Sequence, residues 1–198
     1  SFSSNPNWTY DWRQFVVIDD ANFQTAINLW FSNQVDANAT YGHIRDWNTS
    51  AVTNMENAFK DRTNFNENIS SWDVSSVSAM GQMFRGASKF NQDIGNWNVS
   101  SVTHMGIMFD GASNFNQGIR NWNTLNVSRM EYMFRRAYAF NQNLSNWNIS
   151  KVTKMNNIFD ATNALSNANK GEIHKTFSSD SSWPYPSWSA YAVYTPIT

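Results

Sequence analysis

Apolar residues return along the middle of this chain at a fixed interval of 25 positions. Two of the columns are Trp47, Trp72, Trp97, Trp122 and Trp147, and Met55, Met80, Met105, Met130 and Met155. A valine column and a phenylalanine column follow the same step without an insertion. A repeat of this length with apolar columns is typical of units that bury their apolar faces only against their neighbours. We therefore predict a solenoid of five coils in which identical side chains form internal ladders.

The spacing within one unit predicts a short helix. Met80, Met83, Phe84 and Ala87 lie at i, i+3, i+4 and i+7, which is the spacing of one helix face. A serine or threonine lies two residues before each methionine, where the N-cap of such a helix belongs. These residues are Thr53, Ser78, Thr103, Ser128 and Thr153. The predicted helix has about two turns and depends on its neighbours for stability.

The other half of each unit predicts a short strand that pairs in parallel with its neighbours. Residues 90–94 show the pattern, with polar residues between the apolar Phe90 and Ile94. The predicted fold class is therefore an α/β solenoid whose 25-residue coils each contain one short strand and one short helix. A column of asparagines fits side chains that bond backbone groups left unpaired by tight turns. Its members are Asn66, Asn91, Asn116 and Asn141.

Both ends depart from the repeat and predict helical caps. Asp20 precedes an amphipathic helix that is expected to cover the open edge of the first coil. Its apolar face consists of Phe23, Ala26, Ile27 and Trp30. Ser166 is expected to cap a second helix that runs through Ile173 and Phe177, with residues 183–186 folded back as a lid.

The first ten residues predict a tandem array of modules. Ser1–Tyr10 resembles residues 176–185 at an offset of 175, which equals seven units. The predicted parts are 1–12, the end of a preceding module; 13–40, junction and N-terminal capping helix; 41–160, five coils; 161–190, C-terminal cap; and 191–198, the start of a linker or next module. The junction is short and bulky, so we expect a stiff contact between modules. Its candidate residues are Trp8, Tyr10, Trp12 and Phe15.

Composition narrows the classes of function. The formal net charge is −1, and charged residues make up 15% of the chain, against about 25% in an average globular domain. This balance gives no electrostatic basis for binding nucleic acid. The chain has no cysteine, which excludes disulfides, thiolate metal sites and thiol nucleophiles. No apolar run reaches the roughly 18 residues that a membrane span needs.

The motif W-x-V-S-x-V-T-x-M-x-x-M-F-x-x-A-x-x-F-N-Q-x-I at residues 97–119 resembles the BspA-like leucine-rich-repeat surface proteins. The most similar subgroup is the one first described as Mycoplasma lipoprotein-associated repeats, and the resemblance covers residues 41–160. It implies right-handed leucine-rich-repeat-like coils, secretion, and adhesion or partner binding at the cell surface. The first unit departs most from the pattern, because Ala58 is the counterpart of Met83 and Arg62 replaces the alanine at 87.

Recognition is expected in columns whose residues change from one unit to the next. Five such residues predict an aromatic and cationic patch of the kind enriched at interfaces. They are Ile107, Arg129, Tyr132, Arg135 and Arg136. The alternative is an ordinary solvated face of the predicted helices.

No constellation of residues predicts catalysis. His43, His104 and His174 occupy unrelated positions of the repeat and share no ligand spacing, so we predict no enzyme activity, no cofactor and no metal. We expect a secreted or cell-surface module that serves adhesion, protein–protein interaction or assembly of a tandem array or filament. Its expected partners are a surface protein or glycan and neighbouring copies of the module, with no nucleic acid and no membrane insertion.

Two alternatives stay open. The first is a carbohydrate-recognition domain that uses aromatic residues outside the ladders. These are Tyr132, Tyr138, Trp183, Tyr185 and Trp188, of which the last three also fit a cap on the final coil. The second is an ice- or crystal-binding surface built from threonine or asparagine ladders, although both columns have structural explanations.

Overall fold

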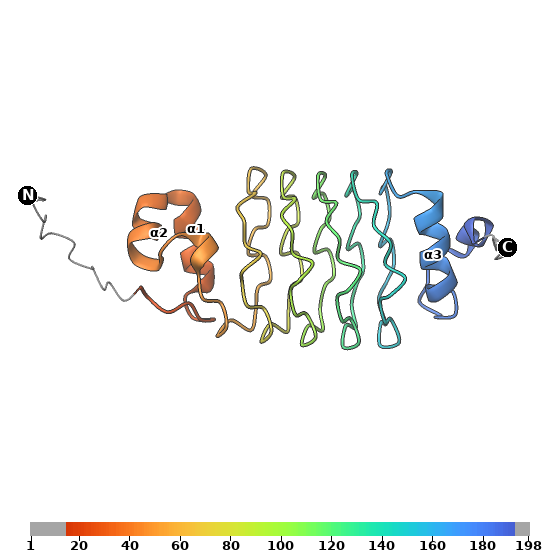
Figure 1. The fold of residues 1–198 in the computed structure, drawn as a ribbon, viewed down its shortest axis with the longest axis horizontal. Helices are drawn as coiled ribbons and strands as arrows, with labels where there is room; N and C mark the ends of the chain where they lie inside the picture. The colour runs from red at the N-terminus through yellow and green to blue at the C-terminus, as the bar shows by residue number, and fades with distance from the viewer. Residues whose placement is uncertain (1–14, 193–198) are drawn as a thin grey trace, which may run out of the picture.

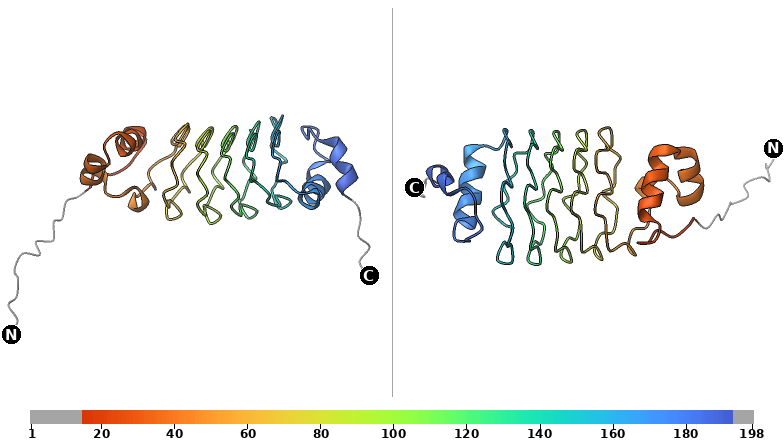
Figure 2. Two further views of the ribbon diagram at one scale, coloured as in Figure 1. Left: turned by 90° about the horizontal axis from the view of Figure 1, so that it is seen from above. Right: turned by 180° about the vertical axis from the view of Figure 1, so that it is seen from behind.

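The computed structural model describes residues 15–192, which form a row of stacked coils with a helical cap at each end (Figure 1). The helical elements are α1 (Phe23–Ser32), α2 (Gln34–Tyr41), the 3₁₀ helix η1 (Ile44–Asp46), α3 (Asn167–Phe177) and the 3₁₀ helix η2 (Pro186–Tyr191). The five repeats lie between η1 and α3. Two further views show the caps at opposite ends of the row (Figure 2).

The N-terminal cap confirms the predicted amphipathic helix. The four residues predicted on its apolar face are all buried in α1. The ring of Phe23 meets that of Trp72 edge-on at 5.8 Å, and Phe31 meets Phe65 in the same way. Asp20 joins this cap to the first coil, because its carboxylate accepts the amide of Thr53 at 2.8 Å and the hydroxyl at 2.6 Å. The hydroxyl of Thr53 also lowers the pKa of Asp20.

The coils contain tandem tight turns, and the prediction of one helix per coil is wrong. In the second coil, alternate amides donate to carbonyls of the third coil at 2.8–3.0 Å; they are those of Met80, Gln82, Phe84 and Gly86. The amides between them close turns three residues back, as Met83 does to Met80 and Arg85 to Gln82. Every second amide therefore bonds the neighbouring coil. In an α-helix each of these amides would instead bond the carbonyl of the fourth residue before it.

The distance between coils explains why a helix does not fit. Stacked phenylalanine rings in successive coils lie close together, with Phe84 and Phe109 at 5.5 Å and Phe90 and Phe115 at 6.0 Å. An α-helix with its side chains is about 10 Å across, so helices on adjacent coils would collide at this spacing. The apolar spacing that resembles a helix face instead follows from the turns, which also direct every third or fourth side chain inward.

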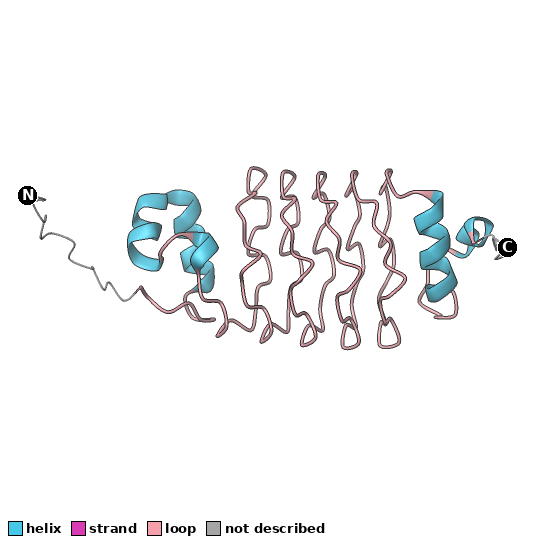
Figure 3. Ribbon diagram, viewed as in Figure 1, coloured by secondary structure: helices cyan, strands magenta, loops and turns pink. Residues whose placement is uncertain are grey.

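No strand forms among residues 15–192, so the predicted α/β solenoid of strand-plus-helix coils is wrong (Figure 3). Backbone pairing of the strand type is limited to isolated parallel bridges. One joins Asp19 to Ala51, and the others follow a single column, such as Ala79 with His104 and His104 with Arg129. The segment predicted as a strand is joined to its neighbour mainly by side chains. The amide of Asn91 donates to Oδ1 of Asn66 at 2.9 Å, and Nε2 of Gln92 donates to the carbonyl of Asn66.

This asparagine ladder confirms the predicted role of the column. Each side-chain oxygen accepts the amide of the next coil at 2.9 Å, from Asn66 through Asn141. The serine and threonine column, in contrast, does not cap helices. The amide and hydroxyl of Ser78 both donate to the carbonyl of Thr53, and the later members repeat this bond. Both columns therefore hold coil to coil.

The core consists of the predicted ladders. Trp97 is 4% exposed, and its indole nitrogen donates to the carbonyl of Ile69 one coil earlier. The rings of Trp122 and Trp147 stack at 6.2 Å with planes 5° apart. Because every ring packs against the coil before and after it, a single coil has no core of its own.

The C-terminal cap also agrees with its prediction. The side chain of Ser166 caps α3 by accepting the amide of Asn169, and Ile173 and Phe177 are buried. Trp188 packs on Phe159 of the last coil at 5.4 Å. The hydroxyl of Tyr185 accepts the amide of Phe159 and donates to Asp160, and burial raises the pKa of this tyrosine. No helix within residues 15–192 has the length and apolar character to cross a membrane.

Candidate functional site

The turn segments of all five coils lie on one side of the stack, which we call the turn face. They comprise residues 54–62, 79–87, 104–112, 129–137 and 154–162. The backbone is nearly the same in each segment, whereas the outward side chains differ from coil to coil. The predicted interaction residues all lie on this face.

Three of the predicted residues meet around a buried acid. The carboxylate of Asp110 is fully buried and accepts hydrogen bonds from both Arg135, at 2.7 and 3.1 Å, and Arg136, at 2.9 to 3.1 Å. The guanidinium of Arg135 also lies over the ring of Tyr132, 4.6 Å from its centre. These four side chains form the arginine cluster. Two arginines and one aspartate leave it with one net positive charge.

Two opposing effects act on Asp110. Burial raises the pKa of its carboxyl, but the hydrogen bonds and charges of Arg135 and Arg136 outweigh burial and lower the pKa below the ordinary value. The acid is therefore ionised at neutral pH and fixes both guanidinium groups. The side chain of Arg136 remains 49% exposed, so solvent reaches a guanidinium group whose position is fixed by Asp110.

Arg129 does not add to the positive charge of this cluster. Its guanidinium bonds the nearly buried carboxylate of Glu131, which neutralises it. Glu131 folds over Gly106, where an added Cβ would lie 2.9 Å from its carboxyl carbon. A second pair joins Glu56 of the first coil and His104 of the third, with Nδ1 and Oε1 2.6 Å apart. Side-chain contacts thus cross the turn face from one coil to another, as Glu56 with His104 and Asp110 with Arg135 show.

Ile107 occupies a strained backbone position. Its φ is 63°, in the left-handed region that a β-branched residue adopts only at a cost. The same column holds Asn57, Gln82, Tyr132 and Asn157, all with positive φ. Helical residues have negative φ, so the helix predicted for this segment did not indicate this conformation. Ile107 is half-buried, beside Tyr132 in the column but outside the arginine cluster.

The aromatic residues considered for sugar binding separate into two groups. Trp183 and Trp188 are 9% exposed and pack on each other in the C-terminal cap, together with Tyr185. Tyr138 is 48% exposed on the fourth coil. Tyr132 has one ring face covered by Arg135. The structure therefore does not assemble these five residues into one platform.

Of the candidate inter-module residues, one lies within the described part of the chain. Phe15 is 52% exposed, and its ring edge faces Gly42, where an added Cβ would lie 3.3 Å away. Trp8, Tyr10 and Trp12 lie outside the described residues.

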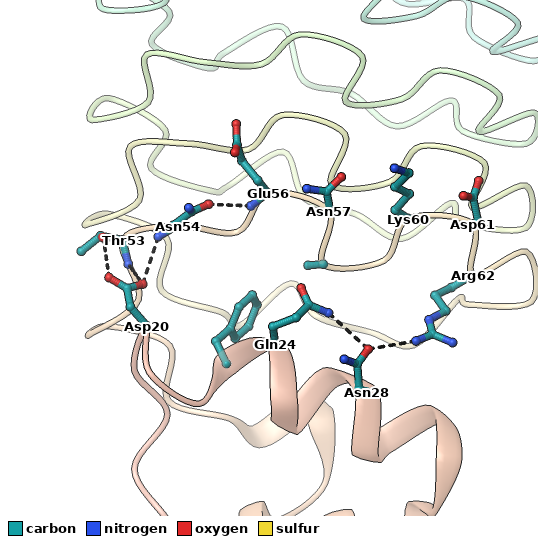
Figure 4. Close-up of a pocket in the computed structure, with 12 residues that line it drawn as sticks. Asp20, Gln24, Asn28, Thr53, Asn54, Glu56, Asn57, Lys60, Asp61 and Arg62 are labelled. Carbon is teal, nitrogen blue, oxygen red and sulfur yellow. Dashed lines mark hydrogen bonds between the residues drawn. The ribbon is translucent and has the colours of Figure 1, made fainter.

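A groove that the sequence did not predict separates α1 from the first coil (Figure 4). Its volume is about 870 Å³. Gln24 and Asn28 of α1 line one side, and most residues between 53 and 62, although not Met55 or Phe59, line the other. The two departures of the first unit, Ala58 and Arg62, both line it. Arg62 bonds Asn28 at 3.0 Å and lies over Phe31. These two departures are the sequence signal of a specialised first coil.

The histidines and carboxylates of the described residues do not gather at one place. No group of three or more histidine, aspartate or glutamate side chains within residues 15–192 is placed to hold a metal ion. The three histidines lie apart, and Nδ1 of His174 accepts the indole N–H of Trp183 inside the cap. The fold defines a repeat protein in which five stacked coils lie between two helical caps.

A family model described as "Mycoplasma protein of unknown function, DUF285" matches residues 25–120 and 93–181. The two matches together span well over half of the chain, so the protein belongs to this family. The matched span extends from α1 into the C-terminal cap and includes all five coils. No curated protein and no solved structure matches the chain.

Proposed function

We propose that this protein is a non-enzymatic, extracellular interaction module, secreted or at the cell surface, that serves adhesion, protein–protein contact or assembly of a tandem array. The observation that carries the proposal is the arginine cluster on the turn face. Its two arginines are held in place by five hydrogen bonds to Asp110, so little conformational entropy is lost when a partner binds.

The stack suits this function because it separates scaffold from surface. The ladders and the asparagine column keep the backbone constant, while the outward-facing residues of the turn face change without affecting the core. The resemblance to BspA-like surface proteins also supports a surface function, and membership in that narrower group is part of the proposal. The net charge of the cluster favours a partner that presents a carboxylate or another anion.

The test measures binding of the purified, labelled protein to intact cells, to immobilised extracellular proteins and to a glycan array. Two variants each remove one member of the cluster without straining the backbone. Tyr132→Asn introduces a residue that occurs twice in its column, and Arg136→Gly introduces a glycine, which also occurs twice in its column. We expect saturable binding by the wild type that weakens at least about tenfold in both variants.

Tyr138→Ala is the matched control, since it removes an exposed tyrosine of the same coil outside the cluster. It should leave the binding unchanged. Absence of saturable binding to every surface, or equal loss in the control, would contradict the proposal. Binding confined to the glycan array would instead support the carbohydrate-recognition alternative.

A further inference from the structure

The first coil has an open row of backbone acceptors. Each turn segment has an amide edge, which donates to the next coil, and a carbonyl edge, which accepts from the coil before it. In the first coil the carbonyl edge consists of the oxygens of Asn54, Glu56, Ala58 and Lys60. None of these accepts a hydrogen bond from any residue between 15 and 192.

These carbonyls belong to the groove under the first coil. All four residues line it, together with Asn57 and Asp61, whose amides donate to the second coil. The opposite wall carries the side-chain amides of Gln24 and Asn28, which are exposed. Figure 4 shows these amides pointing from α1 toward the first coil. The volume of about 870 Å³ lies within the range of ligand-binding sites.

The internal junctions show what kind of group covers this edge. The corresponding carbonyls of the second coil accept alternate backbone amides, with Met55 bonding Ala79 at 2.9 Å and Asn57 bonding Gly81 at 3.1 Å. The third, fourth and fifth coils repeat the pattern. A row of carbonyl oxygens is unfavourable for an anion and favours N–H donors at every second residue. Polypeptide backbone supplies that pattern, as in recognition by addition of a strand to an open edge.

The position of α1 restricts the occupant to a single chain segment. Phe23 and Phe31 hold the helix against the ladders through edge-to-face contacts with Trp72, Phe59 and Phe65. A second folded stack cannot bring a coil onto the open edge without displacing this helix. One segment can enter between the edge and the helix, where the amides of Gln24 and Asn28 face its other side.

We propose that the groove between α1 and the first coil binds a single segment of a partner polypeptide. The segment donates alternate backbone amides to the carbonyls of Asn54, Glu56, Ala58 and Lys60. The site lies at the end of the stack and involves none of the arginine cluster. It therefore adds a second binding surface and does not depend on the proposed function of the turn face.

The probe is a synthetic peptide of residues 151–163, acetylated and amidated at its ends. This sequence contains the amides of Met155, Asn157, Phe159 and Ala161, which occupy the donor positions of the repeat. Titration into ¹⁵N-labelled protein should shift the amide signals of residues 53–62 and of α1. N-methylation of the peptide at Met155 and Asn157 removes two donors and should weaken binding about tenfold or more. N-methylation at Asn156, whose amide lies between donor positions, should change it far less.

Variants of the protein locate the site. Gln24→Trp fills the groove and should abolish the shifts, while Gln34→Trp on the exposed surface of α2 is the matched control. Tyr132→Asn should leave peptide binding unchanged, which separates this proposal from the turn-face proposal. Equal binding of both methylated peptides, shifts outside the groove, or no shift at millimolar peptide would overturn the assignment. Concentration-dependent self-association that Gln24→Trp abolishes would also overturn it, by identifying a second copy as the occupant.

Discussion

The two sides of each coil are bonded to the neighbouring coil in different ways. On the side that carries the asparagine ladder, which we call the ladder side, side chains bond coil to coil. For example, Oδ1 of Asn91 accepts the amide of Asn116 at 2.9 Å. On the turn side, backbone amides bond the next coil directly, as Phe84 bonds Met108 at 2.9 Å. The bonds of the ladder side need a particular side chain, whereas the backbone bonds of the turn side do not. The outward-facing side chains of the turn side are therefore free to vary, while its inward-facing methionines and phenylalanines still repeat.

The difference teaches where to look for function in such a stack. The residues of the ladder side are fixed by the hydrogen bonds and burial that hold the coils together. The turn side keeps its backbone through bonds that are independent of residue type, so charged and aromatic side chains collect there. Both the arginine cluster and the contact between Glu56 and His104 lie on this side.

The largest expected effect comes from breaking a ladder. Trp97→Ala removes a side chain that is 4% exposed and packs on Phe84, so we expect it to lower the free energy of unfolding by about 3–5 kcal/mol. Chemical denaturation measures the change. Asn96→Ala, at the exposed neighbouring position, is the control and should change stability by less than about 0.5 kcal/mol. Equal stability of the two variants would mean that the tryptophan ladder is not core.

A smaller effect is expected when the buried charge of the turn side is removed. Asp110→Asn replaces charge-assisted hydrogen bonds with weaker ones and should cost about 1–3 kcal/mol at pH 7. Because the pKa of Asp110 is lowered in the folded state, its contribution is present above the unfolded pKa of about 3.9 and is lost as the pH falls through the folded value.

The difference in stability between wild type and Asp110→Asn should therefore be constant above about pH 5 and shrink below about pH 4. Urea denaturation across this range measures it. A difference that stays the same down to pH 2 would show that Asp110 does not stabilise the fold through its charge.

The smallest expected effect comes from replacing an outward-facing residue of the turn side, and this change should stabilise the protein. Ile107→Asn relieves a β-branched residue at φ 63° and introduces the residue found at 57 and 157, so we expect a gain of about 0.5–1.5 kcal/mol. Gln82→Asn in the same column is the control and should gain less, since glutamine is not β-branched. Thermal unfolding of both variants tests this, and a loss of stability in Ile107→Asn would show that its packing outweighs the strain.

The ladders, the asparagine column and both caps were predictable from the sequence, because each depends on the repetition of residue types. Local sequence patterns were enough to predict the cap helices. One is the apolar helix face of Phe23, Ile27 and Trp30, and another is the N-cap residue Ser166 before α3. The predicted patch was found only in part. The sequence could place Arg135 and Arg136 side by side, but not the buried Asp110 that holds them from the coil before.

The sequence by itself determined the 25-residue repeat, the identity of the ladders and the positions of the caps, since these follow from spacing alone. Only the tertiary structure decided between helix and turn. Met80, Met83, Phe84 and Ala87 satisfy a helix pattern, yet their backbone forms turns. Coils whose stacked rings lie 5.5–6.2 Å apart leave no room for helices and offer carbonyls to every second amide. The open edge of the first coil is a tertiary property for the same reason. Among residues 15–192 no other coil lies before the first one, and α1 covers the ladders while it leaves the carbonyl edge open.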